Sequence, residues 1–284
     1  MSTPTTRAPA PASDVREATR VRRELRAVHA LVHRDLSRMV GQPAHTALVL
    51  LQPVLYLFVL GGGMAALVPA SALGTGYQTY LFPGILMMTV QTPAVMVGVR
   101  LIIDRQSGYL RELLMAPVGR TTLLLGNCAG GTAVAALQGG VLLSLCGAVG
   151  LPYDPVLLAS LFGGLLLVSF TLTSLSVALA VTLRRPEVFH VLLGVVMMPL
   201  LFLSGGFFPV ENLPGWARAT AAVNPLAHGV DLLRRTISHR VPEHAAPGIE
   251  WFGRQPSPPL EAAVLLTVGL AALTWAAHRF ARQD

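Results

Sequence analysis

The chain has 284 residues, of which 53% are hydrophobic and only 12% are charged, whereas an ordinary soluble domain carries roughly 25% charged residues. This composition excludes a typical soluble enzyme and a disordered protein, and it indicates an integral membrane protein. All 21 basic residues are arginines, which excludes a GxxxxGKS/T phosphate-binding loop and Schiff-base chemistry on lysine. We attribute the net charge of +7 to arginines placed unequally across a membrane rather than to nucleic-acid binding.

The chain begins with a segment rich in proline, threonine and alanine, and we expect a disordered tail over residues 1–13 ahead of one membrane domain, residues 14–284. Asp14–Val40 is predicted to be an amphipathic helix on the inner membrane surface, because its arginines lie off a stripe of apolar residues. His29 and His33 have no third ligand nearby, so we expect no metal site there. The apolar stripe comprises Val21, Leu25, Val28, Val32 and Leu36.

Six further segments are long and apolar enough to cross a bilayer core, which takes ~20 residues per helix. Most arginines lie on segments that are cytoplasmic if the N-terminus is inside, and the two short outer loops carry none. The positive-inside rule therefore predicts an all-α protein of the plasma membrane with six spans and both termini in the cytoplasm, without a cleaved signal peptide. The predicted spans are 46–68, 80–103, 121–150, 155–183, 188–208 and 262–277.

The centres of the predicted spans contain no charged residue, and Arg100 is expected to snorkel from the end of its span. The absence of buried charge argues against an ion-driven carrier and against an acid–base enzyme in the membrane. Gly126 and Gly130 fit a close helix–helix contact. Cys128 and Cys146, assigned to one helix and so ~27 Å apart, are interpreted as packing residues.

The inner loop between the second and third spans is predicted to contain a short amphipathic helix that Pro117 ends. Leucines form one face, and the other face carries Arg105, Arg111, Glu112 and Arg120. Two interpretations remain open on these residues alone: the helix lies at the lipid headgroups, or it docks into a cytoplasmic partner.

The segment after the fifth span is broken by Gly205-Gly206 and Pro209, and it is predicted to form two short outer helices. The first starts near Pro214, and the second follows the Asn224-Pro225 turn. We interpret the polar residues of this segment as part of a solvated loop, although they are the sole candidates for a hydrolase site. They are His228, Asp231, His239, Glu243 and His244.

Together the two segments resemble the ABC-2 type permease family, specifically its daunorubicin-resistance-like drug exporters, over about residues 20–282. The inner loop matches through Gly108, Leu110, Leu113 and Pro117, although its acidic residue, Glu112, is displaced by one position. The second motif comprises Ser204, Gly205, Pro209, Leu213, Pro214, Asn224, Pro225, Leu226 and Arg234.

The resemblance implies a permease subunit that pairs with a second copy, identical or paralogous, each seated on a separate ABC ATP-binding subunit. ATP and Mg²⁺ would bind that subunit, and this chain would bind no cofactor. The ATPase-facing surfaces would be the stripe described above and a coupling loop of Gly108, Leu110, Arg111, Glu112, Leu113, Leu114, Pro117 and Arg120.

The resemblance further implies that spans two and five line the substrate path. Methionine and aromatic walls suit bulky apolar cargo, so we expect a hydrophobic drug or secondary metabolite, although these methionines are also ordinary span residues. Two alternatives are a permease for a lipid or lipid-linked glycan and an ATP-independent secondary carrier. The expected path residues are Met87, Met88, Gln91, Thr92, Met96, Met197, Met198, Phe202 and Phe207.

Overall fold

The computed structural model describes residues 12–68, 73–107, 119–183, 185–209, 214–244, 248 and 256–282, with 12–20 and 120 described as backbone alone. Every regular element within these ranges is a helix, as expected. The α-helices are α1 (Ala12–Gly41), α2 (Pro43–Leu55), α3 (Gly61–Ala65), α5 (Tyr77–Gln106), α7 (Arg120–Leu143), α8 (Pro155–Thr182), α9 (Pro186–Phe202), α10 (Gly215–Val223), α11 (Pro225–Arg240) and α12 (Pro258–Ala281).

Four helical stretches of the described chain are long and apolar enough to cross a membrane: Pro43–Ala65, α5, α8 and α12. The first runs through α2, a π-helical turn at Tyr56–Leu60 and α3, and it contains Pro53, whose missing N–H disturbs the regular hydrogen-bond ladder. α9 is apolar but has only 17 residues. α7 has 24 residues, but asparagine, glutamine and several glycines dilute its apolar sequence.

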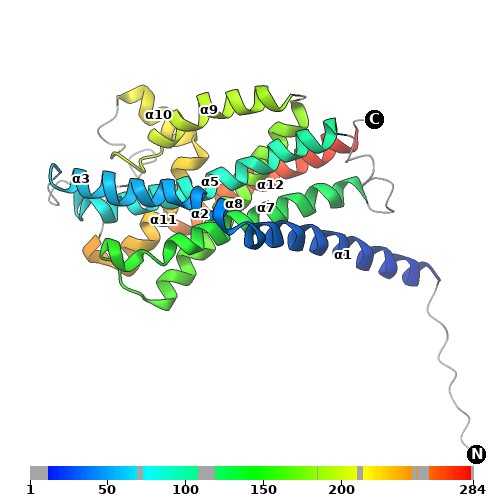
Figure 1. Cartoon of the computed structure of the whole chain (residues 1–284), viewed down its shortest axis with the longest axis horizontal. Helices are drawn as coiled ribbons and strands as arrows, with labels where there is room; N and C mark the ends of the chain where they lie inside the picture. The colour runs from blue at the N-terminus through cyan, green and yellow to red at the C-terminus, as the bar shows by residue number, and fades with distance from the viewer. Residues whose placement is uncertain are drawn as a thin grey trace, which may run out of the picture.

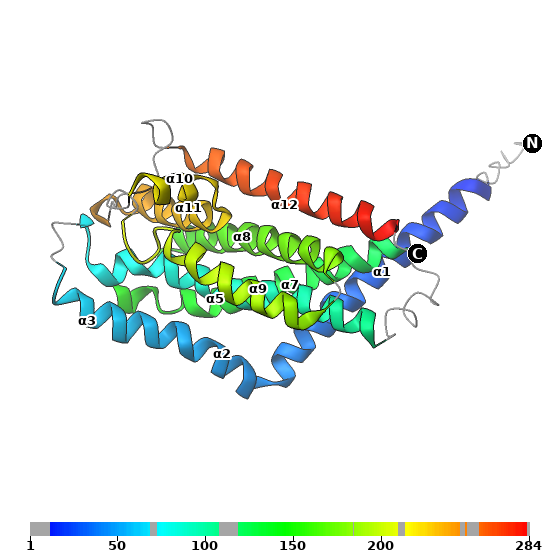
Figure 2. The ribbon, with the colours of Figure 1, turned by 90° about the horizontal axis from the view of Figure 1, so that it is seen from above.

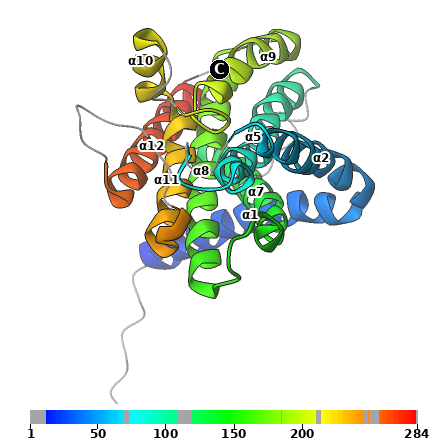
Figure 3. The same cartoon turned by 90° about the vertical axis from the view of Figure 1, so that its left-hand side faces the viewer.

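Helix α8 lies at the centre of the bundle, with α5, α7, α11 and α12 around it (Figure 3). Apolar residues occupy all of its faces, which is typical of a helix enclosed by others. The long helices run side by side, and the start of α1 lies at the same end of the bundle as the end of α12 (Figure 1). α10 and α11 lie at the opposite end.

Helix α1 is a single long helix, as predicted, but it contacts the bundle through a different face from the apolar stripe. Leu31 and Asp35 pack against α7 and are buried, whereas Val21 is 51% and Leu25 63% exposed. The helix leaves the bundle obliquely and extends beyond it (Figure 2). The first part of the stripe is therefore uncovered in the single chain.

The third predicted helix ends earlier than expected. α7 stops at Leu143, and a 3₁₀ turn follows over Cys146–Val149. Gly150 then adopts a left-handed φ of 84°, which a residue without a side chain adopts without strain. The placement of Cys128 and Cys146 in one helix was therefore wrong, although both are buried free thiols, as expected for packing residues.

Candidate functional site

A partly polar crevice opens where α1, α2, α5 and α7 meet. It has a volume of about 590 Å³, and its wall includes Arg38, Met96 and Gln138. A cavity of about 260 Å³ continues it between α2 and α5, because the two share His45 and Thr92. The two cavities together form an extended crevice with both charged and apolar walls.

The charged part of the crevice is organised around Asp35, whose side chain is only 1% exposed. Its Oδ1 lies 3.0 Å from Nη2 of Arg34 and 3.4 Å from Nη1 of Arg100 on α5. The same Arg34 nitrogen donates to Oδ1 of Asn127 on α7 at 3.1 Å. A buried carboxylate requires such partners, so Asp35 links α1 to α5 and α7. Arg100 therefore pairs with a carboxylate, a contact that the snorkelling expectation did not include.

Two glycines on α7 allow Asp35 to reach this position. A Cβ on Gly126 would collide with the Leu31 side chain, and one on Gly130 would lie 2.7 Å from Oδ2 of Asp35. The four-residue spacing places both glycines on the same helix face. This confirms the expected small-residue contact and identifies α1 as its partner.

The crevice wall also contains a buried polar group without a partner. Gln138 is 6% exposed, and within the described chain its side-chain oxygen Oε1 accepts no hydrogen bond. Leaving such an acceptor unsatisfied costs about 1–3 kcal/mol. Gln138 lies two turns along α7 from Gly130, which is ~12 Å, so it is remote from the charged part.

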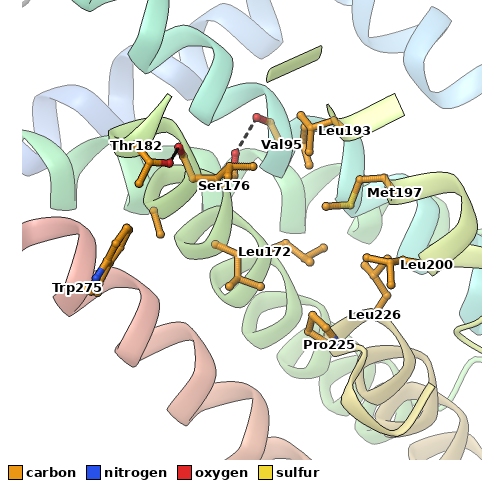
Figure 4. Close-up of a pocket in the computed structure, with 13 residues that line it drawn as sticks. Val95, Leu172, Ser176, Thr182, Leu193, Met197, Leu200, Pro225, Leu226 and Trp275 are labelled. Carbon is orange, nitrogen blue, oxygen red and sulfur yellow. Dashed lines mark hydrogen bonds between the residues drawn. The ribbon is translucent and has the colours of Figure 1, made fainter. Parts of the chain in front are cut away.

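A second cavity, of about 490 Å³, lies between α5, α8, α9 and α12 (Figure 4). Met197 of α9 and Trp275 of α12 line it from different helices. Its two hydroxyl groups are already satisfied, since Ser176 donates to the carbonyl of Val95 at 2.8 Å and Thr182 to that of Leu179 at 2.6 Å. This cavity therefore offers almost purely apolar contacts.

The motif residues after α9 form a hydrogen-bonded junction. The carbonyl oxygen of Gly205 accepts from Nη2 of Arg234 at 2.7 Å and from the Tyr80 hydroxyl at 2.9 Å. The Arg234 guanidinium carbon also lies 4.2 Å from the centroid of the Tyr80 ring. Gly205 adopts a φ of 74°, which favours glycine. These contacts join α5 and α11 to the end of α9.

Asn224 completes this junction from the other side. Its Nδ2 donates to the carbonyl of Leu200 on α9 at 2.6 Å, and its Oδ1 accepts from the Leu226 N–H at 3.0 Å. Asn224 is thus the N-cap of α11, with Pro225 at the favourable first position. Pro209 lies beyond α9 and Pro214 precedes α10, so the motif residues are brought together mainly as a structural joint.

Most of α11 is buried, which corrects the solvated-loop interpretation for His228 and Asp231. Nε of Arg235 lies 2.7 Å from Oδ2 of Asp231 and 3.7 Å from Oε1 of Glu261 on α12. The Asp231 and Glu261 side chains are 1% and 0% exposed. Neither carboxyl group lies at the centre of a predicted span, because Asp231 is on α11 and Glu261 precedes the predicted sixth span by one residue in the first turn of α12, which begins at Pro258.

The five candidate hydrolase residues do not form a common site. His228 and Asp231 are buried, whereas His239 and Glu243 are exposed, and the His244 ring lies 2.9 Å from the Thr75 hydroxyl. The described residues contain no group of three potential metal ligands.

His228 is instead enclosed by the packed end of α11. Burial lowers its pKa, although the carbonyl of Ala222, 3.0 Å from Nε2, and the charge of Asp231 act in the opposite direction. A buried neutral imidazole of this kind is consistent with a structural role.

The expected path residues are divided between several environments. Met88, Thr92 and Met96 line the crevice, and Met197 lines the apolar cavity. Gln91 is half-buried on α5. Met87 and Phe207 are enclosed in the core, while Met198 and Phe202 are exposed on α9. Within one chain, the named α5 and α9 residues therefore face different cavities.

The expected ATPase-facing residues can be located only in part. The coupling loop from Gly108 to Pro117 lies outside the described residues, and Arg120 is described as the first backbone position of α7. On α1, Val28, Val32 and Leu36 are half-buried.

The predicted site residues did not include the members of the charged link, which are Asp35, Arg100 and Asn127. They also did not include Gln138, whose side-chain oxygen is unsatisfied. The sequence signal that points to them is the Gly126–Gly130 pair, which marks the α7 face that another helix approaches.

The chain matches known membrane transport proteins over most of its length. The profile of the ABC-2 type transporter family matches residues 26–237. The putative transport permease ycf38 of Porphyra purpurea is 32% identical over 75% of this chain and 74% of its own. Nodulation protein J of Rhizobium leguminosarum bv. viciae is 30% identical over 66% of this chain and 73% of its own. The probable multidrug ABC transporter permease YbhR of Escherichia coli (strain K12) is 25% identical over 56% of this chain and 44% of its own. The chain therefore belongs to the ABC-2 type transporter family.

Proposed function

We propose that this chain is the membrane permease subunit of an ATP-driven exporter and that a separate ABC ATP-binding subunit supplies the energy. The family match over residues 26–237 carries this proposal. A chain without lysine has no residue for the phosphate-contacting position of a P-loop. ATP and Mg²⁺ would therefore bind the partner, and this chain would convert the partner's movement into transport.

In this proposal α7 and α9 join the four long apolar stretches to give six spans in the plasma membrane. Support comes from the position of α7 between α1, α5 and α8 and from the apolar sequence of α9. The start of α1 and the end of α12 lie at one end of the bundle, which fits two cytoplasmic termini. The exposed Val21 and Leu25 are available to a partner or to lipid.

The proposed cargo is a hydrophobic drug or secondary metabolite. Support comes from the methionines of α5 that line the crevice and from the separate apolar cavity. One relative is named as a probable multidrug permease. A second copy of the chain, or a paralogue, would complete the path, because Met198 and Phe202 on α9 are exposed in the single chain.

Purification of the tagged chain from its native membranes tests the assignment. We expect an ABC ATP-binding subunit to co-purify, and we expect inverted vesicles to accumulate cargo only when ATP is hydrolysed. Accumulation against a gradient by the purified chain alone, driven by a proton gradient, would contradict the proposal and favour a secondary carrier. Cargo that partitions only as a lipid or lipid-linked glycan would replace the drug assignment and leave the ATP-driven mechanism intact.

The coupling loop gives a second test. Leu113→Asp should leave membrane insertion unchanged but uncouple ATP hydrolysis from export, because a charge would enter the apolar face that we expect to dock on the ATPase. Leu113→Met is the matched control, since it keeps volume and apolarity. ATPase activity and export are measured on the same vesicles, and normal export by Leu113→Asp would show that the docking surface lies elsewhere.

A further inference from the structure

We propose that the crevice between α1, α2, α5 and α7 binds an elongated amphiphile with an anionic group at one end and a hydroxyl or N–H donor about two helical turns away. The inference rests on the proposed function, because it describes the chemical class of the exported cargo. Three observations carry it: the unequal charges at one part of the crevice, an unsatisfied buried acceptor at another, and the mostly apolar surface of the remaining wall.

Positive charge exceeds negative charge around Asp35. The guanidinium groups of Arg34, Arg38 and Arg100 interact there with the carboxylates of Asp35 and Asp104. Arg34 contacts Asp35 and Asn127. Within the described residues no carboxylate pairs with Arg38, whose side chain lines the crevice. An arginine in this situation binds a carboxylate or phosphate through two parallel hydrogen bonds.

Arg100 adds a second available donor. It holds Asp35 through a single long contact of 3.4 Å, and a third of its side chain remains exposed in the crevice. An anion placed between Arg38 and Arg100 would neutralise the excess charge without breaking the contact of Arg34 with Asp35. This part of the crevice is therefore suited to the anionic end of a ligand.

The opposite requirement arises at Gln138. Its side-chain oxygen is buried in the same wall and accepts no hydrogen bond in the described chain. The charged part lies at the level of Gly130, which Asp35 contacts, and Gln138 follows ~12 Å further along α7. A ligand that reaches from Arg38 to Gln138 would satisfy this acceptor only with a donor of its own.

The rest of the crevice wall is mostly apolar. Met39, Met96 and Val134 contribute side chains to it, although Gln42, His45 and Thr92 also line the crevice. The hydroxyl of Thr46 already donates to the carbonyl of Met39 at 3.1 Å. The volume of about 590 Å³ falls within the usual range of small-molecule sites, ~300–1,000 Å³. The middle of the ligand is therefore hydrocarbon or another apolar group.

This arrangement distinguishes the cargo from an ordinary membrane lipid. A phospholipid could place its phosphate at Arg38 and Arg100, but its acyl chain would present only hydrocarbon to Gln138 and leave the acceptor unsatisfied. A wholly apolar compound would leave both ends unsatisfied. An amphiphile with polar groups at both ends satisfies the crevice along its length.

Three ten-carbon probes separate these requirements: ω-hydroxydecanoate, decanoate and decanediol. Their binding is measured on the complete transporter in phosphatidylcholine nanodiscs. We expect ω-hydroxydecanoate to bind about tenfold more tightly than either other probe, because one hydrogen bond to an otherwise unsatisfied group is worth about a factor of ten. Equal affinity of all three probes would overturn the proposal.

Two variants locate the binding. Gln138→Leu should abolish the preference for ω-hydroxydecanoate over decanoate while leaving decanoate binding unchanged. Arg38→Gln should weaken both acids about tenfold and leave decanediol unaffected. Arg218→Gln on the exposed surface of α10 is the matched control and should change neither. Unchanged affinities in both crevice variants would place the probes outside the crevice and refute the proposal.

Lipid competition supplies the last arm. The hydroxy-acid measurement is repeated in nanodiscs that contain phosphatidylglycerol. Equal displacement of ω-hydroxydecanoate from the wild type and from Gln138→Leu would identify a lipid site and overturn the cargo assignment. A difference in displacement between the wild type and Gln138→Leu supports the assignment. Co-purification of the ATPase and ATP-dependent transport are scored separately. If the wild-type transporter does not distinguish the three probes but still couples ATP hydrolysis to transport, this inference alone is refuted. Absence of an ATPase partner would refute the proposed function.

Discussion

Replacement of Gly84 by alanine tests the contact between α5 and the segment that follows α9. A Cβ at this position would lie 2.6 Å from the carbonyl oxygen of Gly206 and 2.7 Å from its Cα. Both atoms belong to the backbone, so neither can rotate aside. Ordinary carbon contacts begin at 3.4 Å, and the two segments must therefore move apart by roughly 0.8 Å to restore van der Waals separation.

This movement also affects the neighbouring junction. The Tyr80 hydroxyl donates to the carbonyl of Gly205 at 2.9 Å, and an extra displacement of roughly 0.8 Å would carry the pair beyond hydrogen-bonding distance. Overpacking costs about 1–3 kcal/mol, and a buried group that loses its hydrogen bond costs about 1–3 kcal/mol. Gly84→Ala should therefore lower the free energy of unfolding by about 2–6 kcal/mol.

Gly163→Ala on α8 is the matched control, because no heavy atom lies within 4 Å of its Cβ position. Alanine should stabilise that helix by up to about 1 kcal/mol. Both variants are heated in the same detergent at the same scan rate, since membrane-protein unfolding is often irreversible. We expect the midpoint of Gly84→Ala to fall by at least ~5 °C and that of Gly163→Ala not to fall. Equal midpoints would refute the close backbone contact.

Three further variants test the other buried polar contacts by thermal unfolding. Asn224→Ala removes the α11 N-cap and the bond to α9, and it should cost about 1–2 kcal/mol; an unchanged midpoint would contradict this. Burial lowers the pKa of His228 below 6.5, so the unfolded chain binds more protons below about that pH and stability falls as the pH falls. His228→Asn should therefore lose less stability than the wild type between about pH 7 and about pH 5, and parallel profiles would exclude this contribution. Arg235→Gln removes the arginine whose Nε lies 2.7 Å from the buried carboxylate of Asp231 and should cost about 3–5 kcal/mol; an unchanged midpoint would show that this contact does not stabilise the fold.

The long apolar helices could be predicted because each carries its own signal. Spans of about twenty apolar residues identify α5, α8 and α12 without knowledge of their neighbours. The end of α7 could not be placed, because the residues beyond Leu143 are as apolar as those before it. The helix ends at Leu143, and the 3₁₀ turn that follows ends at Gly150 with positive φ; apolar periodicity does not report either change of conformation.

The polar site was less predictable, because its partners are far apart in the sequence. Asp35 is 65 positions from Arg100 and lies off the apolar stripe of α1, where a carboxylate is expected to face water. Its burial becomes apparent only when the glycines of α7 and the end of α5 are placed beside it. Glu261 was missed for a related reason, since it lies at the edge of a span and is enclosed by α11.

The junction after α9 and the crevice differ in the bonding of two particular groups, the carbonyl of Gly205 and the side-chain oxygen of Gln138. At the junction after α9, the carbonyl of Gly205 receives two donors, and Asn224 satisfies groups on both α9 and α11. In the crevice, by contrast, Gln138 keeps an unsatisfied acceptor. Folding alone would favour leucine at such a position, because an apolar residue of similar size removes the cost of the buried amide. An unsatisfied acceptor in a cavity wall is a candidate contact for a ligand, since local rules are most often broken where a protein has a function.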